Sequence, residues 1–513
     1  MDVHFNLITK PWIPVVSPEG KSTSVGIREA LVNAHYLRQL GCALPHANAA
    51  IYRLLLAILH RVFGPADETE WQALWERGSF DALQLDTYLT RWQERFDLFS
   101  PTHPFYQNRH PKVEIKPANA LLDAVAGGDS DTLFDHTFDA QPITLPADMA
   151  ALILLAAQNF GLAGLCHPQH KLFYADGTCS RAVVFLLQGK NLFESLMLNL
   201  VRYNRRQPIE WAPRKTDLPA WEMDDPYEDE RTIPNGYLDY LTWHSRKIWL
   251  FPSHENGMPV VREITIAPGL VMNAEQLNPM HHYTLDEDNG RKPIRFQEGR
   301  ALWRDSSAIF DLKSNRSINP QALHWTQELI SNGILPHRRL QLAAYGMSTE
   351  PGKHKVHFYR GEEFEFSDDL LNDSETVTAL AEALDTAESL RRQLWGALSN
   401  LASLLLSTES DLEEGRKANP DDVKRMIYHW GAEGFYWKEL ELPFFRLLDS
   451  LSDNNHQAKE DWTQSLRRAG YMAFTHAAKQ CGNDTKGLKA VAKATLQLRH
   501  GMKLVLEPEQ KEE

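Results

Sequence analysis

A change of pattern near residue 372 is the feature that most constrains how this chain can fold. Beyond it, apolar residues recur at helical spacing through four long segments. These segments are 375–406, 420–451, 457–479 and 486–498. The connections between them are polar, and short connections favour antiparallel neighbouring helices. Gly431 and Gly434 predict an interruption of the second segment. The pattern therefore predicts a C-terminal four-helix bundle over residues 372–513.

Residues 1–365 lack this uniform pattern and mix strand-like with helical stretches. Helices are expected at 50–63, 86–96 and 150–157, the last broken by a glycine-containing turn. Strands are expected at 5–8, 12–16, 181–187 and 239–250, and a strand pair at 258–266. Residues 286–290 predict a hairpin turn; they resemble a calcium loop only in part, because the closing glutamate is missing. We expect an α+β fold, in which a large mixed N-terminal domain precedes an all-α C-terminal four-helix bundle.

Composition favours a large, reduced protein. Of 513 residues, 43% are apolar and 14 are tryptophan, which is enough material for large cores. The four cysteines form no closely spaced pair, so we expect a reducing compartment and no disulfide framework. The sequence shows neither a signal-peptide pattern nor an apolar run long enough to span a membrane. We therefore expect a cytoplasmic protein without a membrane partner.

The net charge of −14 has the wrong sign for a protein that coats nucleic acid, because phosphate contact usually leaves a basic footprint. Two local basic spots remain. One contains Arg338 and Arg339, and the other contains Lys353 and Lys355. Local phosphate contact is therefore compatible with the acidic total, and the acidic runs elsewhere are typical of solvated faces.

The sequence shows no combination of residues that is typical of an active site. The chain has no Walker-type phosphate loop, no HExxH helix and no GxSxG nucleophile elbow. Two cysteines and two histidines within 166–179 lack the spacing of a four-ligand zinc site, so a buried thiol beside surface histidines is the preferred interpretation. His281 and His282 are adjacent in a strand-like segment, where neighbours face opposite sides. We expect one of them packed, the other exposed, and no catalytic residue, metal or cofactor in the chain.

Short motifs follow one another in a fixed order along most of the chain. They include Pro11-Trp12-Ile13-Pro14, Leu133-Phe134-Asp135-His136 and Phe160-Gly161-Leu162-Ala163-Gly164, with others at 95–99, 104–107, 191–193, 219–222, 241–246, 278–280, 300–305 and 435–437. Any one of them can arise by chance, but their shared order is specific. Together they resemble the CasA family, the large subunit of the type I-E CRISPR surveillance complex Cascade.

The resemblance implies a non-catalytic subunit of an RNA-guided antiviral complex. Its expected partners are the crRNA, the other Cascade subunits, double-stranded target DNA, and a helicase–nuclease recruited after target binding. In such complexes base pairing reads the target, while protein reads the short adjacent motif, the PAM, on duplex DNA. Two other interpretations stay open: a scaffold subunit that reads no DNA, and an enzyme with an unrecognised site.

The resemblance also implies which residues touch nucleic acid. A glycine loop that approaches the minor groove maps onto Gly161, Leu162, Ala163 and Gly164. Small residues suit a groove only about 6 Å wide. The other interpretation of this loop is a helix C-cap turn that only packs. Where the family carries a lysine finger, His281 is the best placement for the polar group.

The third element that the resemblance implies is a wedge that starts strand separation. It maps onto Thr349, Glu350 and Pro351, which lack the family's glutamine, while Lys353 and Lys355 offset the glutamate. Phe134, Asp135 and His136 match the loop that anchors the guide RNA. Phe134 either stacks on a base, which is worth roughly 1–3 kcal/mol, or packs into the core.

Overall fold

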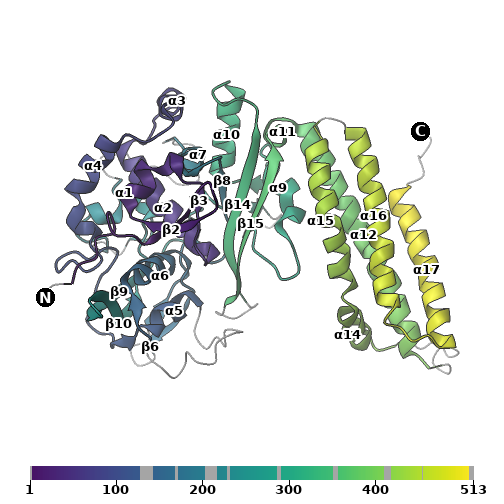
Figure 1. Cartoon of the computed structure of the whole chain (residues 1–513). Helices are drawn as coiled ribbons and strands as arrows, with labels where there is room; N and C mark the ends of the chain where they lie inside the picture. Colours follow the sequence, from purple (N-terminus) through teal and green to yellow (C-terminus); the bar gives the residue numbers. More distant parts are fainter. Residues whose placement is uncertain are drawn as a thin grey trace. The chain divides into compact units, whose positions relative to one another are not determined.

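The computed structural model describes residues 3–126, 143–167, 172–202, 217–227, 231–285, 290–349, 356–408, 418–452 and 455–507. The chain divides into two compact units. The first unit comprises Met1–Leu302 and Leu312–Glu365, and the second comprises Trp303–Asp311 and Phe366–Glu513. The first unit mixes helices and strands and the second is helical, so the expected α+β class is confirmed (Figure 1).

The first strands of the chain form a small antiparallel sheet. β1 (Ile13–Val16) lies between β2 (Ser22–Val25) and β3 (Gln39–Leu40). The strand expected at 12–16 is therefore confirmed, but the one expected at 5–8 is wrong. Those residues form a turn and one isolated bridge, because the Asn6 side chain accepts a hydrogen bond from the backbone N–H of Ile8 at 3.0 Å.

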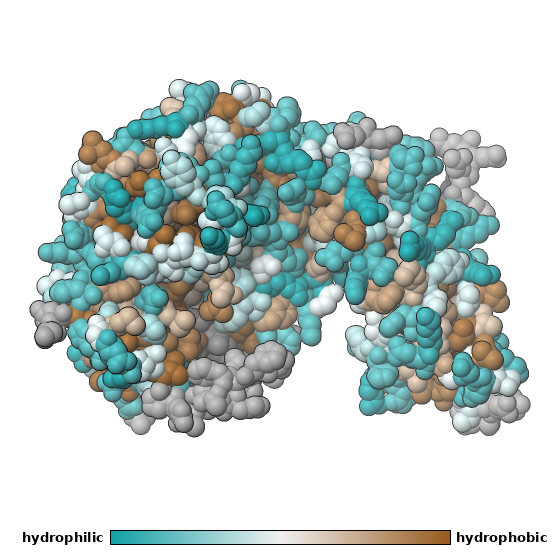
Figure 2. Space-filling view, in the orientation of Figure 1, coloured by the Kyte–Doolittle hydropathy of each residue, from teal (hydrophilic) through white to brown (hydrophobic). Residues whose placement is uncertain are grey.

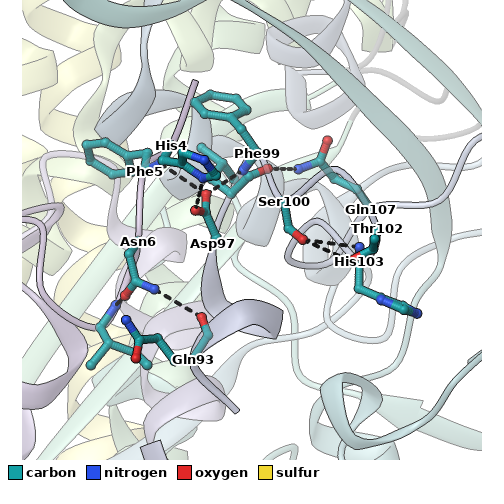
Figure 3. Close-up of polar contacts among 12 residues, drawn as sticks. His4, Phe5, Asn6, Gln93, Asp97, Phe99, Ser100, Thr102, His103 and Gln107 are labelled. Carbon is teal, nitrogen blue, oxygen red and sulfur yellow. Dashed lines mark hydrogen bonds and ion pairs between the residues drawn. The ribbon is translucent and has the colours of Figure 1, made fainter. Parts of the chain in front are cut away.

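Asp97 links the N-terminal residues His4 and Phe5 to the loop that follows the 3-10 helix η2 (Gln93–Phe96) (Figure 3). Its Oδ1 accepts hydrogen bonds from the backbone N–H of Phe5 at 3.0 Å and of Phe99 at 2.9 Å. Its Oδ2 lies 2.7 Å from Nδ1 of His4. One carboxylate thus satisfies backbone donors from two segments far apart in the sequence.

Helix α2 (Pro45–Val62) forms the centre of the first unit and is buried along most of its length. Pro45 suits its first turn, where a missing N–H costs nothing. It contacts α6 (Ala147–Phe160), α7 (Leu192–Asn199) and α8 (Tyr237–Leu241). The helix expected at 50–63 is confirmed, and its burial on nearly all sides is typical of a core helix.

Smaller helices complete the first unit. They are α1 (Ile27–Val32), α3 (Glu68–Arg77), α4 (Ala82–Arg91), α5 (Asn119–Ala126) and α10 (Gln321–Ser331), with 3-10 turns η1 (Ala34–Tyr36) and η3 (Ala220–Glu222). The helix expected at 86–96 corresponds to the end of α4 followed by η2.

A long hairpin organises the second sheet. β9 (Arg246–Glu255) and β10 (Met258–Pro268) are joined by Asn256 and Gly257, both with positive φ, as a two-residue hairpin turn requires. β10 also pairs with β4 (Lys116–Pro117) and β5 (Leu145–Pro146). Residues 258–266, expected as a strand pair, lie within the single strand β10, so the strand character is confirmed but the division into two strands is wrong.

The prediction of strand across 239–250 is only half right, because α8 occupies its first part. The backbone N–H groups of Leu238 and Asp239 each donate to the carboxylate of Asp217 at 3.0 Å. That side chain comes from another segment, so it supplies the first turn of α8 with acceptors that no local pattern announces.

The remaining sheets of the first unit include the one on which the site depends. β14 (Arg339–Thr349) lies between β8 (Val184–Gln188) and β15 (Val356–Ser367). Two smaller sheets contain β6 (Gly164–His167) with β7 (Leu172–Tyr174), and β11 (Tyr283–Leu285) between β12 (Arg291–Pro293) and β13 (Ser317–Ile318). β11 and β12 pair antiparallel on either side of the expected hairpin turn.

The second unit is a bundle of long helices. They are α12 (Ser374–Leu406), α14 (Pro420–Trp430), α15 (Ala432–Ser450), α16 (Asn455–Ala478) and α17 (Thr485–Leu506). The four longest run side by side (Figure 1). The expected interruption is confirmed: α14 ends at Gly431, whose φ of +63° breaks the helix. α17 continues eight residues beyond the expected end at 498.

The segment Trp303–Asp311 joins this bundle, although the sequence pattern had placed it within 1–365. It contains most of η4 (Leu302–Asp305) and α9 (Ser306–Phe310). Trp303 stacks on Phe444 with ring centroids 4.4 Å apart. Hydrophilic residues predominate on the visible surfaces of both units, with apolar residues scattered among them (Figure 2). Among the described residues, no helix is long and apolar enough to cross a membrane.

Candidate nucleic-acid interface

The glycine turn, residues 161–164, follows α6 directly. The helix ends at Phe160, and Gly161 has the extended backbone angles φ −58° and ψ 132°. Gly161 and Leu162 are buried, whereas Ala163 and Gly164 are partly exposed. The helix break expected from the sequence is therefore confirmed, and the exposed half of the turn lies at its C-terminal end.

Three hydrogen bonds to backbone carbonyls hold the buried half of this turn in place. The carbonyl of Gly161 accepts from the backbone N–H of Gly177 at 2.7 Å and from the hydroxyl of Ser180 at 2.9 Å. The carbonyl of Leu162 accepts from Nη2 of Arg246 at 2.9 Å. Arg246 is itself buried and lies over the ring of Tyr174, so a positive charge sits beneath the turn.

The next N–H of the turn is held as well. The backbone N–H of Ala163 donates to Oδ1 of Asp176 at 2.8 Å. The peptide unit between Leu162 and Ala163 is thus fixed at its oxygen by Arg246 and at its nitrogen by Asp176. A backbone held at both ends is pre-organised and loses little freedom when a ligand approaches it.

The two glycines of the turn have different surroundings. A Cβ at Gly161 would lie 2.7 Å from the carbonyl oxygen of Ala157 and 2.8 Å from Nη2 of Arg246. Among the described residues, a Cβ at Gly164 would meet nothing within 4 Å. Gly161 is therefore required by packing inside the protein, while no packing against the described residues explains the small residue at Gly164.

The structure brings the turn close to the strand that leads to the expected wedge. Thr349 is the last residue of β14, and its Oγ1 accepts a hydrogen bond from Nη1 of Arg181 at 3.2 Å. Nε of Arg181 in turn donates to Oδ2 of Asp176 at 3.0 Å. Asp176 and Arg181 were not predicted from the sequence as site residues. Arg181 was noticeable only as the first residue of the run 181–187, whose pattern predicts a strand and no contact with nucleic acid.

His281 does not present a free polar group, contrary to the expectation for the finger. It is buried, with Nε2 accepting from the Asn278 amide at 2.9 Å and Nδ1 3.3 Å from the hydroxyl of Tyr283. Burial, with a smaller effect from the charge of Arg53, lowers the pKa of His281 to about 3, so the ring is neutral. His282 is buried too, so the expectation that one of the two is exposed is wrong.

The arginine pair at 338 and 339 lies at the other end of β14. At about 3.3 Å per residue, Arg339 and Thr349 are roughly 33 Å apart along the strand. Arg338 forms an ion pair with Glu194 at 2.7 Å and lies over the ring of Trp75. The side chain of Arg338 thus serves internal packing, and neither arginine adjoins the glycine turn.

Several expected site residues lie outside the described residues. They are Phe134, Asp135, His136, Glu350, Pro351, Lys353 and Lys355. Of the cysteines and histidines at 166–179, Cys179 is fully buried, and its sulfur lies 3.6 Å from the Asn278 amide. This position agrees with the preferred interpretation of a buried thiol.

Comparison with known proteins decides the family. A sequence model of the family described as CRISPR-associated protein Cse1 matches residues 6–473. The chain belongs to the Cse1 family. CasA/Cse1 of Thermus thermophilus is 30% identical to this Cse1-family chain over 503 residues, 95% of each protein.

Solved structures agree with this assignment. The Cse1-family chain resembles the crystal structure of Thermus thermophilus CasA with a TM-score of 0.80 and 27% identity, covering 98% of this chain and 99% of that one. Cse1 of Acidimicrobium ferrooxidans gives a TM-score of 0.82 at 23% identity over 99% of both chains. A chain of a CRISPR RNA-guided surveillance complex gives 0.76 at 21% identity, covering 97% and 99%. The resemblance inferred from short motifs is confirmed.

Proposed function

We propose that this chain is the large, non-catalytic subunit of a type I-E CRISPR surveillance complex. It assembles with crRNA and the other Cascade subunits, reads the PAM on duplex DNA, and helps start strand separation and R-loop formation. It then offers a docking surface to the helicase–nuclease. Membership of the Cse1 family and the likeness to a chain of an RNA-guided surveillance complex support this proposal.

The glycine turn is the observation that carries the proposal. Its backbone is held by hydrogen bonds from Arg246, Asp176 and Ser180, while no described residue would contact a Cβ at Gly164. In a minor groove about 6 Å wide, a bare backbone can approach the base edges more closely than a backbone that carries a bulky side chain. Ala163 and Gly164 therefore approach the PAM base pairs, and the buried Gly161 and Leu162 set the position of the turn.

The other contacts of the proposal come from the family resemblance. Thr349, at the end of β14, begins the wedge, which continues through Glu350 and Pro351. Lys353 and Lys355 contact phosphate near the wedge, and Phe134, Asp135 and His136 anchor the guide RNA. His281 is not assigned a DNA contact, because its ring is buried and hydrogen-bonded inside the protein.

A scaffold subunit that reads no DNA is the second candidate. The burial of His281 and the internal ion pair of Arg338 favour it, because both residues were expected to contact DNA. The two candidates differ in one respect: only the first requires PAM-dependent binding through the glycine turn.

The deciding experiment uses the complex assembled with guide RNA and the other subunits. Binding to PAM-containing and PAM-free duplexes is compared at matched salt for wild type and Gly164→Leu. We expect Gly164→Leu to weaken binding to the PAM duplex by about as much as one mismatched base pair, roughly 1–3 kcal/mol, with little effect on the PAM-free duplex.

Gly434→Leu is the matched control, because Gly434 is exposed and equally open to a Cβ but lies in the helical unit. This control is expected to bind like wild type. Equal affinity of wild type and Gly164→Leu for the PAM duplex, with assembly intact, would favour the scaffold.

A further inference from the structure

One continuous chain of hydrogen bonds joins the glycine turn to the end of β14. It runs from the N–H of Ala163 to Asp176 at 2.8 Å, from Asp176 to Nε of Arg181 at 3.0 Å, and from Nη1 of Arg181 to Thr349 at 3.2 Å. The guanidinium of Arg181 therefore contacts both sides at once. Thr349 is 168 positions away from Arg181 in the sequence, so only the fold creates this link.

The segment 176–181, which carries this link, also forms other hydrogen bonds to the glycine turn. The backbone N–H of Gly177 and the hydroxyl of Ser180 both donate to the carbonyl of Gly161. Farther along, Val184 of β8 pairs with Tyr345 of β14. Residues 176–181 thus form a short bracket fixed to the turn at one end and to β14 at the other.

The ion pair between Asp176 and Arg181, at the two ends of this bracket, is expected to add little to folding stability. The side chains of Asp176 and Arg181 are 33% and 26% exposed. Partly exposed ion pairs contribute only about 0–1 kcal/mol to folding. A hollow of about 570 Å³ among the described residues, lined by Arg181, Thr349 and Arg295 among others, lies alongside.

We infer that Asp176 and Arg181 are positioning residues that hold the PAM-reading turn and the C-terminal end of β14 at a fixed separation. Docking of the turn on the PAM then sets the position of Thr349, where the proposed wedge begins. Without the pair, the turn still binds, but the end of β14 is no longer held at this separation. The inference rests on the proposed function, since it assigns distinct tasks to the turn and to the end of β14.

The link from Asp176 to Thr349 depends on the planar geometry of the Arg181 guanidinium and not on its charge alone. Arginine presents a planar fork that satisfies two acceptors, whereas lysine presents a single point charge. Arg181→Lys keeps the positive charge but cannot reproduce both contacts. Arg181→Gln removes the fork and the charge together, so comparison with Arg181→Lys separates the effect of geometry from that of charge.

The test measures PAM binding and base-pair opening separately in the assembled complex. Binding is measured on PAM and PAM-free duplexes, and opening by a fluorescent adenine analogue in the first base pair beyond the PAM. We expect Arg181→Lys and Arg181→Gln to bind the PAM duplex as wild type does. Their opening signal should fall by about tenfold, the effect of one lost hydrogen bond to a charged group.

Arg28→Gln is the matched control, because Arg28 forms a partly exposed ion pair with Asp86 between α1 and α4. It should change neither signal. Unchanged opening in both variants, wild-type opening in Arg181→Lys alone, or an equal loss in the control would each overturn the inference while leaving PAM reading in place. Absence of PAM preference in wild type would instead refute the proposed function, and the inference with it.

Discussion

Alanine at Gly161 places a methyl group where the structure has no room for it. Its carbon would lie 2.7 Å from the carbonyl oxygen of Ala157, part of the α6 backbone, and 2.8 Å from the Arg246 guanidinium. Ordinary contacts of this kind begin at about 3.4 Å. The helix backbone cannot retreat cheaply, so the guanidinium must shift and its 2.9 Å hydrogen bond to Leu162 is strained.

The size of the effect follows from these two terms. Insertion of a methyl group into a packed site costs typically about 1–3 kcal/mol. Weakening a buried hydrogen bond to a charged group adds about 1 kcal/mol or more. We therefore expect Gly161→Ala to lower the free energy of unfolding of the first unit by about 2–4 kcal/mol.

The same substitution at Gly164 should behave in the opposite way. Its Cβ would meet no described residue within 4 Å, and its φ is not among the positive values found at six other described glycines. Alanine there restricts the unfolded chain more than the folded one, so stability should stay constant or rise by up to about 1 kcal/mol.

Urea unfolding of the full-length chain, followed by tryptophan fluorescence, measures both variants. A loss of about 2–4 kcal/mol corresponds to a downward shift of the midpoint by about 1 M. If Gly164→Ala is as unstable as Gly161→Ala, or if Gly161→Ala is as stable as wild type, the packing argument for the turn is refuted.

Two further predictions concern the stability of the units. Burial lowers the pKa of His46, His244 and His281 from 6.5 to about 3, so the unfolded chain binds these protons first as pH falls. Each histidine's contribution is fully present above about pH 6.5 and is lost toward pH 3, at about 1.4 kcal/mol per pH unit. Urea unfolding across this range should show a shallower slope for His46→Phe than for wild type; an equal slope would contradict the prediction. The helical unit includes Trp303, which is 3% exposed, so Trp303→Ala should lower the free energy of unfolding of this unit by about 3–5 kcal/mol. An unchanged melting curve of the helical circular dichroism signal would contradict this.

Local pattern was sufficient for the elements whose interactions are local. The helical periodicity beyond residue 372 corresponds to α12, α14, α15, α16 and α17, and the break at Gly431 was expected. The break after α6 and the strand character of β10 were likewise predicted. Helix periodicity, turn residues and caps depend on neighbours within a few positions, so the sequence displays them directly.

The sequence also indicated the family, because the order of the short motifs is kept where overall identity is low. It indicated the candidate site only in part. The glycine turn and Thr349 were predicted as separate elements, but nothing in the sequence indicated that Asp176 and Arg181 join them.

The tertiary structure alone decided which residues face inward. It buried His281 against Asn278 and Tyr283, engaged Arg338 with Glu194, and filled the space around Gly161 but not around Gly164. Likewise, Asp217 turned an expected strand into α8 by accepting two backbone hydrogen bonds from a distant segment. Each outcome depends on a partner far away in the sequence, and residue type alone does not specify which partner the fold brings near.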